Sequence, residues 1–186
     1  MANLSDAYGN MILRGDWTPS MIDNLNIIKE EWGSWDFATH VTDDFKSVDI
    51  EVPFNACGRW CYDNNLFHIG NWTKESKKEK VLNAYQRLCD ELKSKIDENG
   101  DYTAYIEVNF SEEECGNDIL RTCKSEIYLC TEDMIGQHLS GDMLMNNLTA
   151  KIIEENDYDY TNENLVELGF YESLEEIEKE LEDCEN

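Results

Sequence analysis

Residues 73–110 read TKESKKEKVLNAYQRLCDELKSKIDENGDYTAYIEVNF and decide the fold, because they join a helix pattern to a strand pattern through one turn. Thr73 is a suitable N-cap, Asn99-Gly100 is a suitable end, and we expect a helix over 74–96. Its apolar residues fall at helical spacing: Val81, Leu82, Tyr85, Leu88, Cys89, Leu92 and Ile96. After the turn, apolar residues alternate with polar ones, which predicts a strand with one buried face: Tyr102, Ala104, Ile106, Val108 and Phe110.

The chain before this stretch contains a strand, a helix and a hairpin pattern. Residues 7–14 suit a first strand, and Thr18-Pro19 begins a helix that Gly33 ends. Alternation over 35–41 and 48–54 predicts a hairpin across Asp43-Asp44. Residues 55–72 have no clean period, which is typical of a long structured loop.

The chain after it continues with a loop that holds Glu112, Glu113 and Glu114, and then with a strand over 121–130. Apolar spacing predicts a helix over 143–155. Ser173 and Glu176 form a capping box for a last helix.

The order strand, helix, hairpin, helix, hairpin contains the β-α-β-β-α-β pattern of a ferredoxin-like sandwich, in which two helices cover an antiparallel sheet. We therefore expect an α+β protein with a ferredoxin-like core over residues 1–131. Residues 132–186 are expected to form an acidic helical C-terminal extension that packs on this core.

The net charge restricts the partners. The 186 residues include 41 acidic and 15 basic side chains, which gives a formal charge of −26. This sign opposes direct binding of nucleic acid or anionic lipid and favours a basic protein as partner. The helix over 74–96 carries a cluster of basic residues, which we interpret as a solvated face or a docking site for the acidic tail. A nucleic-acid contact there is the less favoured alternative.

The cysteines and the apolar runs indicate the compartment. Seven cysteines, an odd number, are scattered over predicted strands and helices, which favours reduced thiols over a disulfide framework. No apolar run approaches the ~20 residues of a membrane span, and the first residues lack the pattern of a signal peptide. We expect a cytoplasmic protein with no membrane contact.

Motifs for catalysis are missing from the sequence. No phosphate-binding glycine pattern follows a strand, and no nucleophile elbow occurs, so we expect no catalytic residue and no cofactor. Cys57, Cys61 and His68 offer three metal ligands at a non-standard spacing, and we interpret the cysteines as packing residues. A small enzyme or metal protein that uses this segment stays open. Trp60 and its aromatic neighbours form either a contact patch or a cover over an open end of the sheet.

The acidic residues are concentrated at the C-terminal end. Residues 154–186 hold fourteen Asp or Glu and one Lys, and their net charge of −13 is half of the total. The last helix alone brings one net charge every ~3.3 Å, close to the ~3.4 Å spacing of phosphates along one DNA strand. A basic groove built for a phosphate backbone could accept such a surface.

In composition and size the chain resembles the acidic decoys of bacteriophages and mobile elements, which act as anti-CRISPR or antirestriction DNA mimics. This resemblance implies a non-catalytic inhibitor that occupies the nucleic-acid site of a basic enzyme. A regulatory or scaffold protein for another basic partner is the alternative. The expected partner-binding carboxylates are Asp157, Asp159, Glu163, Glu167, Glu172, Glu175, Glu176, Glu178, Glu180, Glu182, Asp183, Glu112, Glu113 and Glu114.

Overall fold

The computed structural model describes residues 4–34, 37–132 and 145–184. Its elements are β1 (Leu4–Gly15), α1 (Pro19–Trp32), β2 (Phe37–Val41), β3 (Glu51–Arg59), α2 (Tyr62–Lys74), α3 (Glu79–Lys93), β4 (Ala104–Glu114), a 3-10 turn (Cys115–Asn117), β5 (Ile119–Cys130), β6 (Asn147–Asp157), α4 (Asn162–Glu167) and α5 (Leu174–Cys184). The chain is thus an α+β protein. No helix among the described residues is both long and apolar enough to cross a membrane.

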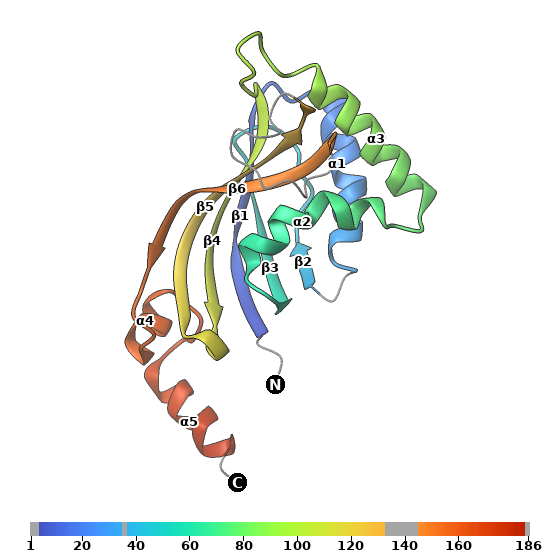
Figure 1. Cartoon of the computed structure of the whole chain (residues 1–186). Coiled ribbons are helices and arrows are strands. Elements are labelled where there is room, and N and C mark those ends of the chain that lie inside the picture. Colours follow the sequence, from blue (N-terminus) through green and yellow to red (C-terminus); the bar gives the residue numbers. More distant parts are fainter. Residues whose placement is uncertain (1–3, 35–36, 133–144, 185–186) are drawn as a thin grey trace.

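The described strands form one six-stranded sheet in the order β2-β3-β1-β4-β5-β6, and every neighbouring pair is antiparallel. Helices α1, α2 and α3 lie together on one side of this sheet, whereas α4 and α5 lie at its far end (Figure 1). We call the side without α1–α3 the open face. The strand predicted over 121–130 is β5, whereas β6 was not predicted as a strand.

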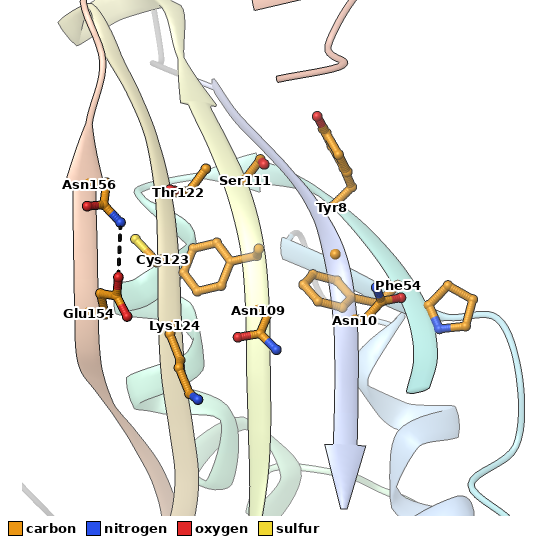
Figure 2. Close-up of a pocket in the computed structure, with 13 residues that line it drawn as sticks. Tyr8, Asn10, Phe54, Asn109, Ser111, Thr122, Cys123, Lys124, Glu154 and Asn156 are labelled. Atoms are coloured by element: carbon orange, nitrogen blue, oxygen red, sulfur yellow. Dashed lines mark hydrogen bonds between the residues drawn. The ribbon is translucent and has the colours of Figure 1, made fainter. Parts of the chain in front are cut away.

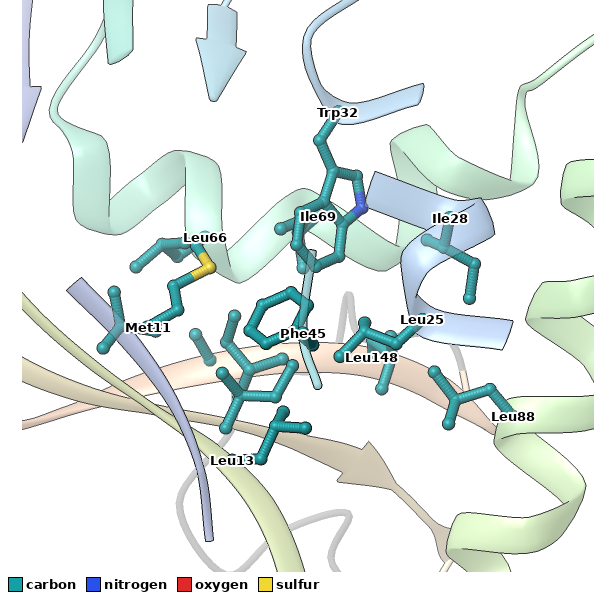
Figure 3. Close-up of a cluster of buried hydrophobic side chains, with 14 of the residues drawn as sticks. Met11, Leu13, Leu25, Ile28, Trp32, Phe45, Leu66, Ile69, Leu88 and Leu148 are labelled. Atoms are coloured by element: carbon teal, nitrogen blue, oxygen red, sulfur yellow. The ribbon is translucent and has the colours of Figure 1, made fainter. Parts of the chain in front are cut away.

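The main core lies between the sheet and α1–α3 (Figure 3). Met11 and Leu13 of β1 face Leu25 and Ile28 of α1, and these four side chains are fully buried. Phe45, from the connection between β2 and β3, also enters this core and is 2% exposed. Burial of these side chains is the main favourable contribution to folding.

Local signals correctly placed α1 and the hairpin of β2 and β3. Thr18 caps α1 by accepting a hydrogen bond from the Met21 amide, and Pro19 is its first residue. β2 pairs with β3 as expected. Their connection is longer than predicted because the side chain of Asn26 binds both the amide and the carbonyl of Phe45 and holds that residue over the core.

The loop predicted over 55–72 and the cap predicted at Thr73 are wrong. β3 continues to Arg59, and residues 62–74 form α2. Thr73 lies buried inside α2, where its hydroxyl donates to the Ile69 carbonyl and accepts from the Trp32 indole. Polar and glycine residues interrupt the apolar stripe of α2, and this hides its period in the sequence.

The helix predicted over 143–155 is also wrong in its described part. Residues 147–157 form β6, which pairs with β5 and places Leu148 opposite Leu129 and Ala150 opposite Ile127. Apolar residues spaced by four fit a helix and a strand equally well. Only the pairing with β5 decides between them, and residues 143–144 lie outside the described part.

The C-terminal segment builds a small second core on the sheet. Leu120 of β5, Leu165 of α4 and Ile177 of α5 are buried together, and six partly buried residues between 158 and 171 surround them. The capping box is present in altered form: the Glu176 amide donates to the Ser173 hydroxyl, and the Glu176 carboxylate accepts from the Glu172 amide. The acidic tail therefore docks on β5 and not on the lysine-rich α3.

The close approach of α2 to β6 at Gly70 gives a stability prediction. A Cβ atom there would lie closer than 3.0 Å to the Leu148 carbonyl oxygen and to Asn147 Oδ1. We expect Gly70→Ala to lower the free energy of unfolding by about 1–3 kcal/mol, measured by urea denaturation. If the space at Gly70 were open, alanine would instead raise the free energy of unfolding by roughly 0.8–1 kcal/mol, because alanine has the higher helix propensity. The sign of the measured change therefore shows whether α2 and β6 approach each other closely at Gly70.

Candidate functional site

The segment from Asp157 to Glu180, here called the acidic end, presents its carboxylates to solvent. All nine expected contact carboxylates of this segment are exposed. None of the nine forms an ion pair with a Lys, Arg or His of the described chain. Glu182 and Asp183 belong to the last turn of α5, but their side chains lie outside the described part. The acidic end is therefore a dense surface of negative charge that finds no cationic partner among the described residues.

Contacts with the sheet hold the acidic end in place. The Tyr160 hydroxyl donates to the Glu113 carboxylate, and Phe170 packs edge-on against Tyr8 of β1 with ring centroids 5.0 Å apart. Gly169, with φ +82°, lies directly against the Tyr8 hydroxyl. These contacts, together with the burial of Leu120, Leu165 and Ile177, hold α4 and α5 against the sheet and leave the nine carboxylates exposed.

Glu112 and Glu114 do not belong to a contact surface, contrary to the sequence expectation. They are the last inward residues of β4 and are 0% and 2% exposed. Glu113 points to the open face but is half-buried under Tyr160, and burial raises the pKa of its carboxyl. The loop predicted at Glu112, Glu113 and Glu114 is wrong, because β4 continues through all three residues.

Glu112 is the centre of a buried ion-pair network with Arg121. Its Oε2 accepts from Arg121 Nε at 2.9 Å and from Nη2 at 2.7 Å. Its Oε1 accepts from the Ser5 hydroxyl at 2.8 Å and from the Tyr62 amide at the start of α2. Arg121 also pairs with Asp63 and with Glu155 of β6, each at 3.0 Å. The network thus links β1, β4, β5, β6 and the N-terminus of α2.

This network accounts for the one compact group of potential metal ligands that the described residues form. Ligand atoms of Cys61, Asp63 and Glu112 lie within 4.8 Å of one another. Arg121 already supplies the positive charge there, and the Glu112 carboxylate already accepts four hydrogen bonds. The Cys61 thiol donates to Glu114 at 3.0 Å, and burial is the main cause that raises its pKa to about 12. A metal ion would have to displace Arg121.

The structure does not bring Cys57, Cys61 and His68 together. Cys57 lies exposed at the end of β3, where its pKa is raised to about 11, first by a hydrogen bond with Asp6. Cys61 lies beside Glu114, an inward residue of β4. His68 lies within α2, next to the Asn71 side chain.

The open face carries a shallow hollow of about 640 Å³ (Figure 2). Amides and hydroxyls of neighbouring strands line it: Asn10, Asn109, Ser111, Thr122 and Asn156. Its lysine, Lys124, is paired with Glu107 at 3.1 Å. Cys123 also borders the hollow, but its side chain is buried in the main core, and this burial raises the pKa of its thiol to about 12. These groups can form hydrogen bonds, but they do not combine an activated nucleophile with a base.

A second hollow, of about 800 Å³, separates the acidic end from β1 and β3. Asp6, Glu113, Glu176 and Glu180 line it, together with aromatic rings of the acidic end. Besides burial, the charges of Asp6 and Glu180 raise the pKa of Glu113. This hollow adds to the negative charge of the acidic end.

Sequence reasoning missed the pairing of Glu112 with Arg121, although the sequence contained a signal for it. The two residues lie directly opposite each other in the register of β4 and β5. Extending the predicted strands to a tight turn near residue 116 would have placed them as a cross-strand pair of opposite charge. The assignment of Glu112 to a loop removed that possibility.

Loss of Arg121 tests the network. We expect Arg121→Met to lower the free energy of unfolding by about 3–5 kcal/mol, because it leaves the Glu112 charge buried without a partner. The double variant Arg121→Met/Glu112→Met should be more stable than the single one in chemical denaturation. An equal or lower stability of the double variant would contradict this account.

Glu107 gives a pH prediction. A hydrogen bond from Arg14, followed by those from Asn109 and Lys124, lowers its pKa from 4.5 to about 2. The unfolded chain therefore binds this proton more readily, so the carboxylate stabilises the fold above about pH 4.5, and this contribution is lost as the pH falls toward 2. Glu107→Gln should lower Tm at neutral pH, and its difference from the parent should shrink in acid. A difference that is constant with pH, or equal to that of exposed Glu98→Gln, would exclude this role.

Comparison of the chain with models of protein families, with curated proteins and with solved structures finds no match. Its function therefore has to be inferred from its own residues.

Proposed function

We propose that this protein is a non-catalytic inhibitor that binds the basic nucleic-acid-binding surface of a partner enzyme, as a phage-encoded anti-CRISPR or antirestriction DNA mimic would. The observation that carries this proposal is the set of nine exposed carboxylates on the acidic end, which form no ion pair with a cation of the described chain. A surface of this kind has a strong attractive potential for a cationic groove.

The geometry of α5 supports mimicry of a phosphate backbone. Its 11 residues extend over about 16 Å at ~1.5 Å per residue. Glu175, Glu176, Glu178 and Glu180 follow one another along this short helix. Their density along the axis is comparable to that of phosphates, which are ~3.4 Å apart along one DNA strand. A partner that uses Lys and Arg to hold nucleic acid can use the same side chains here.

The thiols favour binding over catalysis. The thiolate is the nucleophilic form of cysteine, and a reactive cysteine has a lowered pKa. Here the pKa values of Cys57 and Cys89 are raised to about 11 and those of Cys61 and Cys123 to about 12. Burial is the first cause for all but Cys57, where the hydrogen bond with Asp6 comes first. These thiols stay protonated at neutral pH.

The architecture supports a ferredoxin-like scaffold for this surface. Strand β3 lies between β1 and β2, and β1 lies between β3 and β4, so that two strand-helix-strand units are each split by an inserted strand. We propose that β1–β4 with α1, α2 and α3 form this unit. In this proposal, β5 and β6 extend it toward the acidic end.

The test uses a variant that removes charge without removing a cap or a buried contact. Glu163, Glu167, Glu175 and Glu178 are exposed and are changed together to Gln. The assays are DNA binding and cleavage by a guide-RNA-loaded Cas9-type nuclease and by a panel of restriction endonucleases. We expect the parent protein to inhibit a member of this set in competition with DNA, with an effect that weakens steeply between about 50 and about 200 mM salt. The variant should associate more slowly, with dissociation less affected.

A matched control carries the same change of net charge elsewhere. Asp23→Asn, Glu75→Gln, Glu79→Gln and Glu98→Gln remove four exposed carboxylates of α1, α3 and their neighbouring turns. This control should inhibit as the parent does. Equal loss in both variants would mean that net charge alone matters. Unchanged inhibition by the first variant would exclude the acidic end as the contact, and capture without competition by DNA would favour a scaffold role for another basic partner.

A further inference from the structure

Trp60 is a large apolar side chain that the fold leaves in solvent. It is 61% exposed, whereas Tyr62, two residues later, is fully buried. Phe67 and Trp72, the other aromatic residues of this segment, are half-buried in α2. Of the aromatic residues that the sequence offered as a contact patch, Trp60 is thus the one that a partner can reach fully.

The backbone of Trp60 is strained. Its φ of +69° lies in the left-handed region, which glycine adopts freely and bulky residues rarely do. The residues around it impose this conformation. Asn65 Nδ2 donates to the Arg59 carbonyl at 3.3 Å and to the Cys61 carbonyl at 2.8 Å. The Tyr62 amide is held by the Glu112 carboxylate.

Neither packing nor turn geometry explains a tryptophan at this position. Trp60 leaves 61% of its surface in solvent, and glycine would adopt the required φ without cost. Strained residues that their surroundings hold in place are concentrated at binding and active sites. The combination of strain and exposure at Trp60 therefore points to a contact outside this chain.

Trp60 lies at the same end of the sheet as the acidic end. In the sheet register Arg59 pairs with Leu4, Ser5 pairs with Glu114, and Glu114 pairs with Ile119. The next residue, Leu120, is buried in the small core that holds the acidic end. Three strand spacings of about 4.8 Å separate the last residue of β3 from the first residue of β5, which lie about 14 Å apart. The end of β3 and the helices α4 and α5 lie at this end in Figure 1. Leu4, across from Arg59, is also 56% exposed.

We propose that Trp60 is the anchor that receives an arginine side chain of the basic partner, an inference that rests on the proposed function. Tryptophan has the most favourable aromatic face for a cation, and the planar guanidinium also stacks on it. The acidic end attracts the partner over a long range, and Trp60 provides a short-range contact that distinguishes arginine from lysine. A second copy of this chain fits the site less well, because its charge of −26 opposes self-association.

The experiment measures binding of fluorescently labelled oligo-arginine and oligo-lysine peptides of equal length to the full chain. The parent should bind the arginine peptide at least about threefold more tightly. Trp60→Gly should bind both peptides equally and should have an unchanged or higher Tm, because glycine relieves the strain at φ +69°. Leu82→Ala, at a 37% exposed position on α3, is the matched control and should keep the preference.

The outcomes separate this inference from the proposed function. A parent without arginine preference, a Trp60→Gly variant that keeps it, or a marked loss of Tm in Trp60→Gly would overturn the role of Trp60. A concentration-dependent dimer of the parent that Trp60→Gly abolishes would also overturn it and assign the site to a second copy. The proposed function fails separately if the Glu163/Glu167/Glu175/Glu178 variant binds both peptides as tightly as the parent.

Discussion

The buried pair of Glu112 and Arg121 is the interaction on which the arrangement of this protein most depends. A carboxylate at 0% exposure is unfavourable unless its charge and its lone pairs are satisfied, and four hydrogen bonds satisfy those of Glu112. The Cys61 side chain makes no cap contact, so the Glu112 carboxylate serves as the acceptor at the start of α2. One side chain thereby sets where α2 begins and how it meets the sheet.

The same network connects the scaffold to both parts of the proposed contact surface. Arg121 points inward from β5, and its neighbour Leu120 lies in the small core that carries the acidic end. On the other side, the Tyr62 amide ties Glu112 to the turn that contains Trp60. A strand that alternates its side chains between two faces can hold a buried ion pair and an apolar anchor at consecutive positions. Rigid support of this kind limits the ordering of side chains that binding requires.

Charge is distributed unevenly over the molecule. The basic residues of α3 and its surroundings are partly neutralised within the chain, as Lys78 pairs with buried Glu31 at 2.8 Å. On the open face, Arg14 and Lys124 are both engaged by Glu107. The carboxylates of the acidic end have no such partners in the described chain. The acidic end therefore presents nine exposed carboxylates, none paired with a cation of the described chain, at one end of the sheet.

The sequence by itself determined the features that depend on neighbouring residues. Thr18-Pro19 placed α1, alternation placed β2, β3 and β4, Ser173 and Glu176 placed α5, and composition gave the charge of −26. Only the tertiary structure decided that 147–157 is a strand, that 62–74 is a helix, that Glu112 is buried and that Trp60 is exposed. In these cases the local pattern does not identify the structure. The spacing of apolar residues in 147–157 fits a helix as well as a strand, and the charge of Glu112 suggests an exposed side chain. The choice between the states depends on contacts with residues far away in the chain, such as β5 for β6 and Arg121 for Glu112, and a local pattern contains no information about these partners.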